Sequence, residues 1–168
     1  RNQRRKLVQS LDLDTPSSVK QDFVDWVKQA SENNGSFPQV SKNKIKKIYA
    51  LSYVLYHHQR YQDARHFFCL LTETSPNEAK FWKGFGACLQ MLKDYEGALN
   101  CYCCSAQFSK QIDPYLYVQT ADCYFATKQV EAGLKALEIA GNIAKKADNK
   151  QVLQHVSFMK QIWATSKK

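Results

Sequence analysis

The chain has 168 residues, of which 44% are apolar or aromatic, enough for one domain with a substantial core. Its net charge of +9 lies at the ends, because residues 1–47 carry ten Lys/Arg and five Asp/Glu, residues 145–168 carry six and one, and the middle carries eight and nine. Positive flanks around a near-neutral centre argue against a nucleic-acid recognition surface, and no run reaches the ~20 apolar residues of a membrane span.

The first predicted helix lies in an N-terminal arm, residues 1–44, whose basic start leads into acidic residues and not into the apolar run of a secretory signal. Ser18 with Gln21 three residues later is typical of a capping box, and the helix should stop at Gly35. Its apolar face is larger than packing on one neighbour requires. We therefore expect a dimer interface there, with packing on the next unit as the alternative; its residues are Val19, Phe23, Trp26 and Val27.

A period of 34 residues runs through the centre of the chain. Six columns align: Ile48, Trp82 and Leu116; Ser52, Gly86 and Thr120; Leu55, Leu89 and Cys123; Tyr61, Tyr95 and Gln129; Ala64, Ala98 and Ala132; Phe68, Tyr102 and Ala136. A fixed period of this size indicates stacked helical units. The alanine column suits two antiparallel helices that approach closely.

These columns resemble the tetratricopeptide pattern, with units beginning at Ile45, Ala79 and Asp113, and with Pro76 at the end of the first. The third unit matches less well, although Asp113-Pro114 supplies a helix start. We expect an all-α fold in which three tetratricopeptide repeats, an α-solenoid over residues 45–147, form six helices in antiparallel pairs. With one helix before and one after, the total is eight, and no strand is expected. An ordinary helical bundle with coincidental spacing is the alternative.

The last predicted helix lies in residues 148–168 and begins near Asn149. It carries an apolar stripe of Val152, Val156, Met159, Ile162 and Trp163. Terminal units of a solenoid need a cover, so this stripe is expected to cap the third repeat.

The first helix of each unit should line the concave face of the superhelix. Counting the second, fifth, ninth and twelfth positions gives Lys46, Tyr49, Tyr53 and Tyr56; Lys80, Lys83, Ala87 and Gln90; Pro114, Tyr117, Ala121 and Tyr124. Five of these are tyrosines, which offer rigid amphipathic contact area to a partner. A core role for each tyrosine is the alternative.

One family shares several of these features. The run from Ile48 to Tyr56, then Tyr61-Gln62-Asp63-Ala64, Gly86-Ala87-Cys88, Tyr95, Asp113-Pro114 and Ala121-Asp122-Cys123, resembles the class II chaperones of bacterial type III secretion systems, over about residues 15–145. The resemblance implies a protein of the bacterial cytoplasm that holds hydrophobic translocators before export. It implies a homodimer made through the N-terminal helix and first repeat, and a groove for an extended translocator segment that includes Tyr49, Tyr53, Tyr56 and Tyr61. The family commonly has a further tyrosine near the position that Cys104 occupies here.

No cofactor, metal or catalytic set is expected. The cysteines lie within helical patterns and should be free thiols, and the cluster Cys101, Cys103 and Cys104 lacks the second pair that a zinc site needs. The histidines have no nucleophile or carboxylate motif around them, which argues against an enzyme.

Two other binding functions stay open: a generic tetratricopeptide interaction adaptor and, less favoured, a basic nucleic-acid-associated adaptor. A repeat module that clamps a C-terminal carboxylate needs Lys and Asn at the fifth and ninth positions of its first helix. Tyr49 and Tyr53 stand there instead, which argues against such a clamp.

Overall fold

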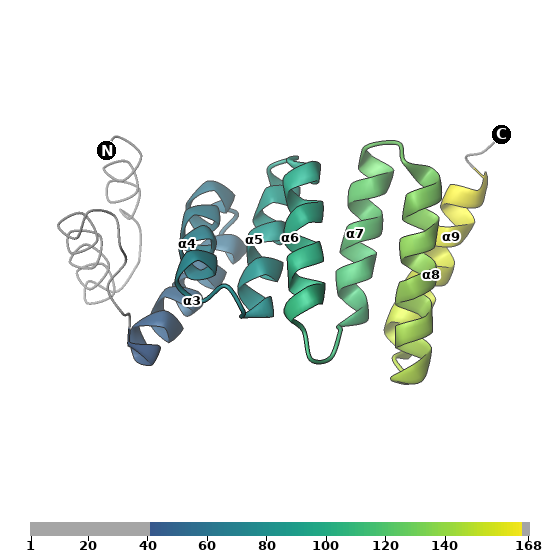
Figure 1. Cartoon of the computed structure of the whole chain (residues 1–168). Helices are drawn as coiled ribbons and strands as arrows, with labels where there is room; N and C mark the ends of the chain where they lie inside the picture. The colour runs from purple at the N-terminus through teal and green to yellow at the C-terminus, as the bar shows by residue number, and fades with distance from the viewer. Residues whose placement is uncertain (1–40, 166–168) are drawn as a thin grey trace.

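The structure, a computed structural model, describes residues 41–165, and these residues form seven helices and no strand. The helices are α3 (Lys42–His57), α4 (Tyr61–Thr74), α5 (Ala79–Met91), α6 (Tyr95–Phe108), α7 (Pro114–Ala126), α8 (Val130–Lys146) and α9 (Lys150–Thr165). They follow one another in a single row from the blue α3 to the yellow α9 (Figure 1). The predicted all-α fold is confirmed, while the helix predicted in the N-terminal arm lies outside the described residues.

Each pair of helices is closed by the same turn. The residues Gln59, Lys93 and Lys128 follow the helix ends and have positive φ angles of 59°, 64° and 61°. The next N–H in each turn donates to the carbonyl five residues earlier: Arg60 to Leu55 (2.9 Å), Asp94 to Leu89 (2.9 Å) and Gln129 to Tyr124 (2.8 Å). This is the Schellman pattern, which satisfies carbonyls that a helix end would leave unpaired. The three pairs α3–α4, α5–α6 and α7–α8 are therefore equivalent units.

The third unit is one residue out of the predicted register. Helices α5 and α7 have 13 residues each, and α4 and α6 have 14 each. The linker between α4 and α5 is residues 75–78, whereas that between α6 and α7 is the longer 109–113. Asp113 is the N-cap of α7, accepting the Tyr115 N–H at 3.0 Å, so the third unit begins at Pro114. A single extra loop residue leaves helix packing intact but shifts every later column.

The corrected register replaces Ala132 by Gly133 in the small-residue column. Ala64 and Ala98 have no exposed surface, and Gly133 is buried like them, whereas Ala132 is half-buried. A Cβ atom on Gly133 would lie 2.3 Å from the Phe125 ring. The closest approach of α7 and α8 is therefore at the glycine, and the assignment of Ala132 to this column was wrong.

The Gly133→Ala variant should lower the free energy of unfolding by about 1–3 kcal/mol, because the new methyl group overpacks a buried ring. Phe125 is 4% exposed and has little room to move. Gly141→Ala is the matched control on α8, since its Cβ would meet nothing closer than Val156 Cγ1 at 3.5 Å. Without a clash, the better helix propensity of alanine should raise stability by ~0.5–1 kcal/mol. Urea denaturation of both variants measures the two shifts, and equal shifts would contradict the corrected register.

The helices form two layers, with α3, α5, α7 and α9 in one and α4, α6 and α8 in the other. Alternate helices touch mainly in the first layer, where α3 contacts α5, α5 contacts α7 and α7 contacts α9. When the helices of one layer lie closer together than those of the other layer, the row curves toward the closer layer. The first layer therefore lines the inner face of the curve, as the repeat pattern predicts.

The C-terminal helix covers the last unit. The Asn149 side chain accepts the Val152 N–H at 3.1 Å, which starts α9 where the sequence predicts. Val152 and Val156 are buried, and the Trp163 ring stacks on Phe125 at 4.4 Å. The capping role is confirmed. The predicted stripe was wrong only at Ile162, which is 43% exposed.

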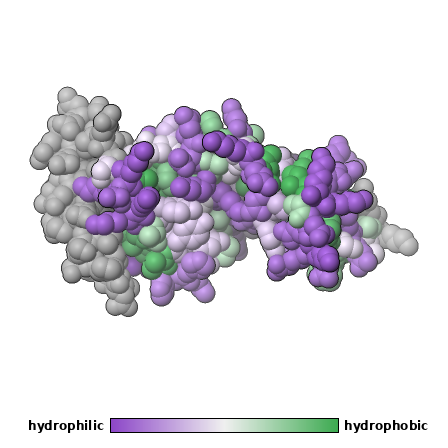
Figure 2. Space-filling model, turned by 90° about the horizontal axis from the view of Figure 1, so that it is seen from below, coloured by the Kyte–Doolittle hydropathy of each residue, from purple (hydrophilic) through white to green (hydrophobic). Residues whose placement is uncertain are grey.

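One face of the row is largely hydrophilic (Figure 2). Seen from below, hydrophobic residues form small separate groups among hydrophilic ones (Figure 2). Of the helices α3 to α9, none combines the length and the apolar character that crossing a bilayer requires.

Candidate functional site

Aromatic rings of α3 gather on the inner layer. Tyr49 lies edge-on to Tyr53, with ring centres 5.0 Å apart, and Tyr56 lies edge-on to Tyr61 at 5.3 Å. The ring of Phe68, from α4, approaches Tyr53 at 5.8 Å. Edge-to-face contacts of this kind hold aromatic rings in defined orientations. These four tyrosines, three from α3 and Tyr61 from the start of α4, form two ring pairs that we call the tyrosine cluster.

The spacing in α3 explains why the cluster is accessible. Tyr49, Tyr53 and Tyr56 recur at helical intervals and share one side of the helix. The core side carries Ile48, Leu51 and Leu55, which are at most 6% exposed. Tyr53 is 41% exposed, and the other three tyrosines are half-buried. The cluster therefore presents aromatic surface outside a complete core.

A hollow of about 140 Å³ lies beside the cluster, between α3, α5 and α7. We call it the groove hollow; it is lined by Tyr53, Tyr56, Phe68, Lys83, Gly84, Ala87 and Gln119. A Cβ atom on Gly84 would lie 2.2 Å from the Phe68 ring, so only glycine lets that ring form part of the lining. The structure thus brings together four predicted groove residues from two units.

Sequence counting missed three residues of the lining: Phe68, Gly84 and Gln119. Phe68 lies on the second helix of its unit, whereas only first-helix positions were counted. Gln119 occupies in α7 the position that Gly84 occupies in α5, once the extra residue in 109–113 is taken into account. It is the sixth residue of its unit, a position that lies outside the counted second, fifth, ninth and twelfth.

Two lysines border the tyrosine cluster. Lys80 Nζ lies 5.3 Å from the ring centres of both Tyr49 and Phe81, a cation–π arrangement. Lys83 Nζ donates to Asp113 Oδ2 at 2.5 Å, which joins α5 to the start of α7. Partial burial raises the pKa of Asp113, but the Lys83 ammonium and the Tyr115 N–H outweigh it and hold that pKa below its ordinary value. The charge of Lys83 is therefore balanced beside the groove hollow.

Burial also controls the hydroxyl groups. It raises the pKa of Tyr49 and of Tyr56, with the neighbouring Tyr53 adding to both shifts. Both side chains thus stay neutral at physiological pH and act as hydrogen-bonding hydroxyls, not as anions. The surface that results is aromatic, uncharged and suited to apolar peptide groups.

Three predicted groove residues of the third unit, Tyr117, Ala121 and Tyr124, do not line the groove hollow. Ala121 has no exposed surface. Tyr117 and Tyr124 are half-buried and pack against the core around Val118 and Leu137. In the corrected register all three take the fourth, eighth and eleventh positions, which face the partner helix within a unit. The counting error of one residue is the cause.

The predicted dimer interface is not part of the described structure. Its residues, Val19, Phe23, Trp26 and Val27, lie outside the described residues.

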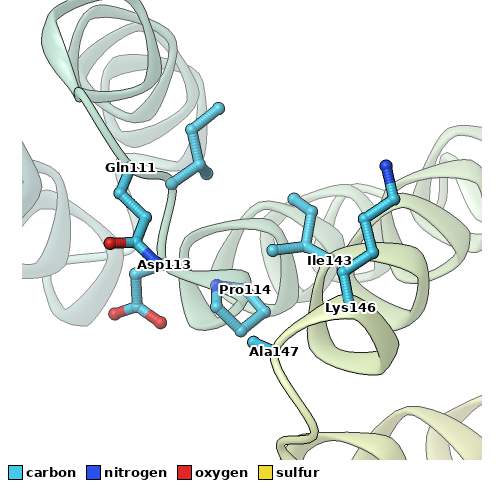
Figure 3. A pocket seen from close by; sticks show the side chains of 7 residues that line it. Gln111, Asp113, Pro114, Ile143, Lys146 and Ala147 are labelled. Carbon is cyan, nitrogen blue, oxygen red and sulfur yellow. The ribbon is translucent and has the colours of Figure 1, made fainter.

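A larger open hollow of about 580 Å³ lies at the ends of the helices of the third unit. Figure 3 shows it between the 111–114 segment and the end of α8, with the Asp113 and Lys146 side chains extending away from each other. Asp113 is already engaged by Lys83 and the Tyr115 N–H. The groups around this hollow do not converge on one point, so it is the weaker candidate.

The described residues hold no group of side chains suited to a metal ion. Between residues 41 and 165, no three His, Cys, Asp or Glu side chains gather as a metal site would require. The six cysteines are free thiols. Burial raises the pKa of Cys88, Cys101 and Cys123 to about 12, which keeps these thiols protonated and unreactive. They pack as small apolar side chains.

Repeated helix pairs, identical turns and a curved inner layer define the class of protein: the chain is an α-solenoid of tetratricopeptide repeats. The family model of the tetratricopeptide repeat matches residues 45–74 and 79–106, which are the first two units. The third unit follows from the structure.

Among known proteins, the chain is similar to translocator chaperones of type III secretion. Low calcium response locus protein H of Yersinia pestis is 25% identical over 122 residues, which cover 72% of each chain. PcrH of Pseudomonas aeruginosa, solved with the chaperone binding region of PopD, is 22% identical with a TM-score of 0.72, covering 77% of this chain and 97% of PcrH. SycD of Yersinia enterocolitica, solved with a peptide of the translocator YopD, is 23% identical with a TM-score of 0.71, covering 78% and 100%. SycD is also described as a dimer. The resemblance seen in the sequence is thereby confirmed.

Proposed function

We propose that the chain is a chaperone of the bacterial cytoplasm that holds hydrophobic type III secretion translocators before their export. It acts by binding and not by catalysis. An extended client segment lies along the inner layer and places apolar side chains against the tyrosine cluster and in the groove hollow.

The accessible tyrosine cluster is the observation that carries this proposal. Tyr53 keeps 41% of its surface exposed although an apolar core lies directly behind it. Aromatic groups in such a position are typical anchors for a partner, because they bury a large area at low entropic cost. The similarity to proteins solved with translocator peptides gives the partner its class.

The test starts with a pull-down of the full chain from its native bacterium, with mass spectrometry of the captured proteins. Calorimetry then measures the captured translocator segment against the wild type and the Tyr53→Ala, Tyr56→Ala double variant. Truncation of a central aromatic anchor commonly costs ~2 kcal/mol or more, about 30-fold in affinity, so the double variant should show no measurable binding. The wild-type affinity should change little with salt, because residues 48–144, with eight Lys/Arg and nine Asp/Glu, are close to neutral as a whole.

Two controls keep the test specific. Phe158→Ala removes an aromatic side chain that is 60% exposed on α9, and it should bind as the wild type does. Tyr53→Phe with Tyr56→Phe keeps both rings and should retain most of the affinity. Binding that survives in the double alanine variant, with its helix content intact by circular dichroism, would place the client elsewhere. A steep loss with salt would favour a phosphate-binding surface instead.

We also propose that the chain is a homodimer formed through Val19, Phe23, Trp26 and Val27, residues that lie outside the described range. Light scattering of the chain with and without residues 1–35 tests this interface. A dimer that persists after the deletion would rule it out.

A further inference from the structure

One amide in the groove hollow has no internal partner. The carbonyl oxygen of Gln119 is buried and accepts no hydrogen bond within the described part of the chain. Gln90 shows the usual arrangement, since its Oε1 accepts the Tyr102 hydroxyl at 2.6 Å. Buried polar side-chain atoms are nearly always paired in this way, because an unpaired one has lost its water without replacement. The unpaired carbonyl oxygen of Gln119 therefore requires an explanation.

No described side chain around the groove hollow donates to the Gln119 carbonyl. The neighbouring Lys83 ammonium is committed to Asp113 at 2.5 Å. Across the groove hollow stand the rings of Tyr53 and Tyr56, and the other side is formed by small residues of α5. The polar groups of the lining are therefore the Gln119 amide, the Lys83 ammonium and the hydroxyls of Tyr53 and Tyr56.

We infer that the Gln119 carbonyl accepts a hydrogen bond from the bound client segment, and that the groove hollow therefore selects an uncharged N–H or O–H donor at that point of the segment. This inference rests on the proposed function and adds a polar requirement to it. A cationic donor is disfavoured, because it would lose its hydration in a hollow whose described lining holds no carboxylate to pair with it. The donor is either a backbone N–H or the end of a neutral side chain such as Asn, Gln, Ser or Thr.

The size of the groove hollow agrees with such a group. Its volume of about 140 Å³ corresponds to a few water molecules, at ~30 Å³ each in the liquid. One medium-sized side chain fits the same space. A client group that displaces this water must replace the hydrogen bond to the amide or lose affinity.

The experiment uses a phage-displayed library of random twelve-residue peptides, selected on the full wild-type chain. The tightest peptide is then measured by calorimetry against the wild type, Gln119→Met and Gln62→Met. Methionine keeps the length of glutamine but cannot serve as the amide acceptor. Gln62 is exposed on α4, in the other layer, and provides the same change away from the groove.

We expect Gln119→Met to bind the peptide about tenfold more weakly, since a donor left without its acceptor costs roughly one power of ten. Gln62→Met should bind as the wild type does, and the free Gln119→Met chain should melt at the same or a higher temperature. Peptides with one N-methylated amide, or with one donor side chain replaced by alanine, show which source supplies the donor. At the peptide position that donates to Gln119, the modification should weaken binding to the wild type but should not weaken binding to Gln119→Met.

Unchanged or tighter binding by Gln119→Met would overturn the inference while leaving the groove intact. A lowered melting temperature with unchanged affinity would assign Gln119 a purely structural role and would also overturn it. A library that yields no binder, or only binders that tolerate Tyr53→Ala with Tyr56→Ala, would instead refute the groove and with it the proposed function.

Discussion

Phe68→Ala should lower the free energy of unfolding by about 3–5 kcal/mol, the usual cost of removing a fully buried phenylalanine. Phe68 is 1% exposed, and its ring contacts Tyr49 and Tyr53 while lying over Gly84. Its loss leaves a cavity between α3, α4 and α5 and removes the support behind the tyrosine cluster. Since small domains are stable by only ~5–15 kcal/mol, the effect is large. Urea denaturation followed by circular dichroism measures it.

Two further variants test whether the destabilisation comes from the buried Phe68 ring and its contact with Gly84. Phe158→Ala is the same change at a residue that is 60% exposed, and it should shift stability by no more than ~0.5 kcal/mol. Gly84→Ala should destabilise the wild type, because its Cβ would stand 2.2 Å from the Phe68 ring. In the Phe68→Ala background that clash is gone, and the same alanine should become neutral or stabilising. Additive effects of the two changes would show that the ring does not pack on Gly84.

The helical architecture could be predicted from the sequence because its causes are local. The Tyr-x-x-Ala openings at Tyr61 and Tyr95, the small residues at close helix contacts and the Asp113-Pro114 start each act within a few residues. These signals repeat, so one uncertain column is supported by the others. The structure confirms each of these helix starts.

The residues counted for the groove lie around one hollow only where the period holds. Tyr53, Tyr56, Lys83 and Ala87 lie together as counted, because α3 and α5 are separated by the regular linker. The longer 109–113 linker changes the register of α7, and nothing in helix periodicity reveals an extra loop residue. Ala121 was therefore assigned to the surface although it is fully buried. A fixed offset cannot recognise an insertion; only the helix ends reveal it.

The lining from α4 and α7 was missed for a different reason. Phe68 reaches the groove hollow through the space that Gly84 leaves open, which is a contact between residues of different helices. Periodicity identifies which side of a helix is buried but does not tell how a ring passes a glycine on a neighbouring helix. Such pairs have to be seen in the assembled fold.

Val156→Asp should lower the free energy of unfolding by about 3–5 kcal/mol, because it buries a carboxylate without a partner. Val156 is 4% exposed and packs with Val152, Ala140 and Ala144 where α9 covers α8. In a solenoid each unit contacts only its neighbours, so the damage should stay local. Hydrogen exchange should show α8 and α9 losing protection while α3 and α4 keep theirs. Uniform loss of protection from α3 to α9 would contradict this, as would no loss at all.

The charge itself can be separated from the change in shape. Gln154→Asp places the same carboxylate on the exposed side of α9 and should leave stability within ~0.5 kcal/mol of the wild type. In Val156→Asp, burial raises the folded-state pKa of the new carboxyl above its unfolded value. Relative to the wild type, the deficit is then greatest above the folded-state pKa and shrinks as the pH falls toward the unfolded pKa of ~3.9, where the group is neutral in both states. A deficit that is constant between pH 7 and pH 4 would mean that lost packing, and not the buried charge, frees α9 from the third unit.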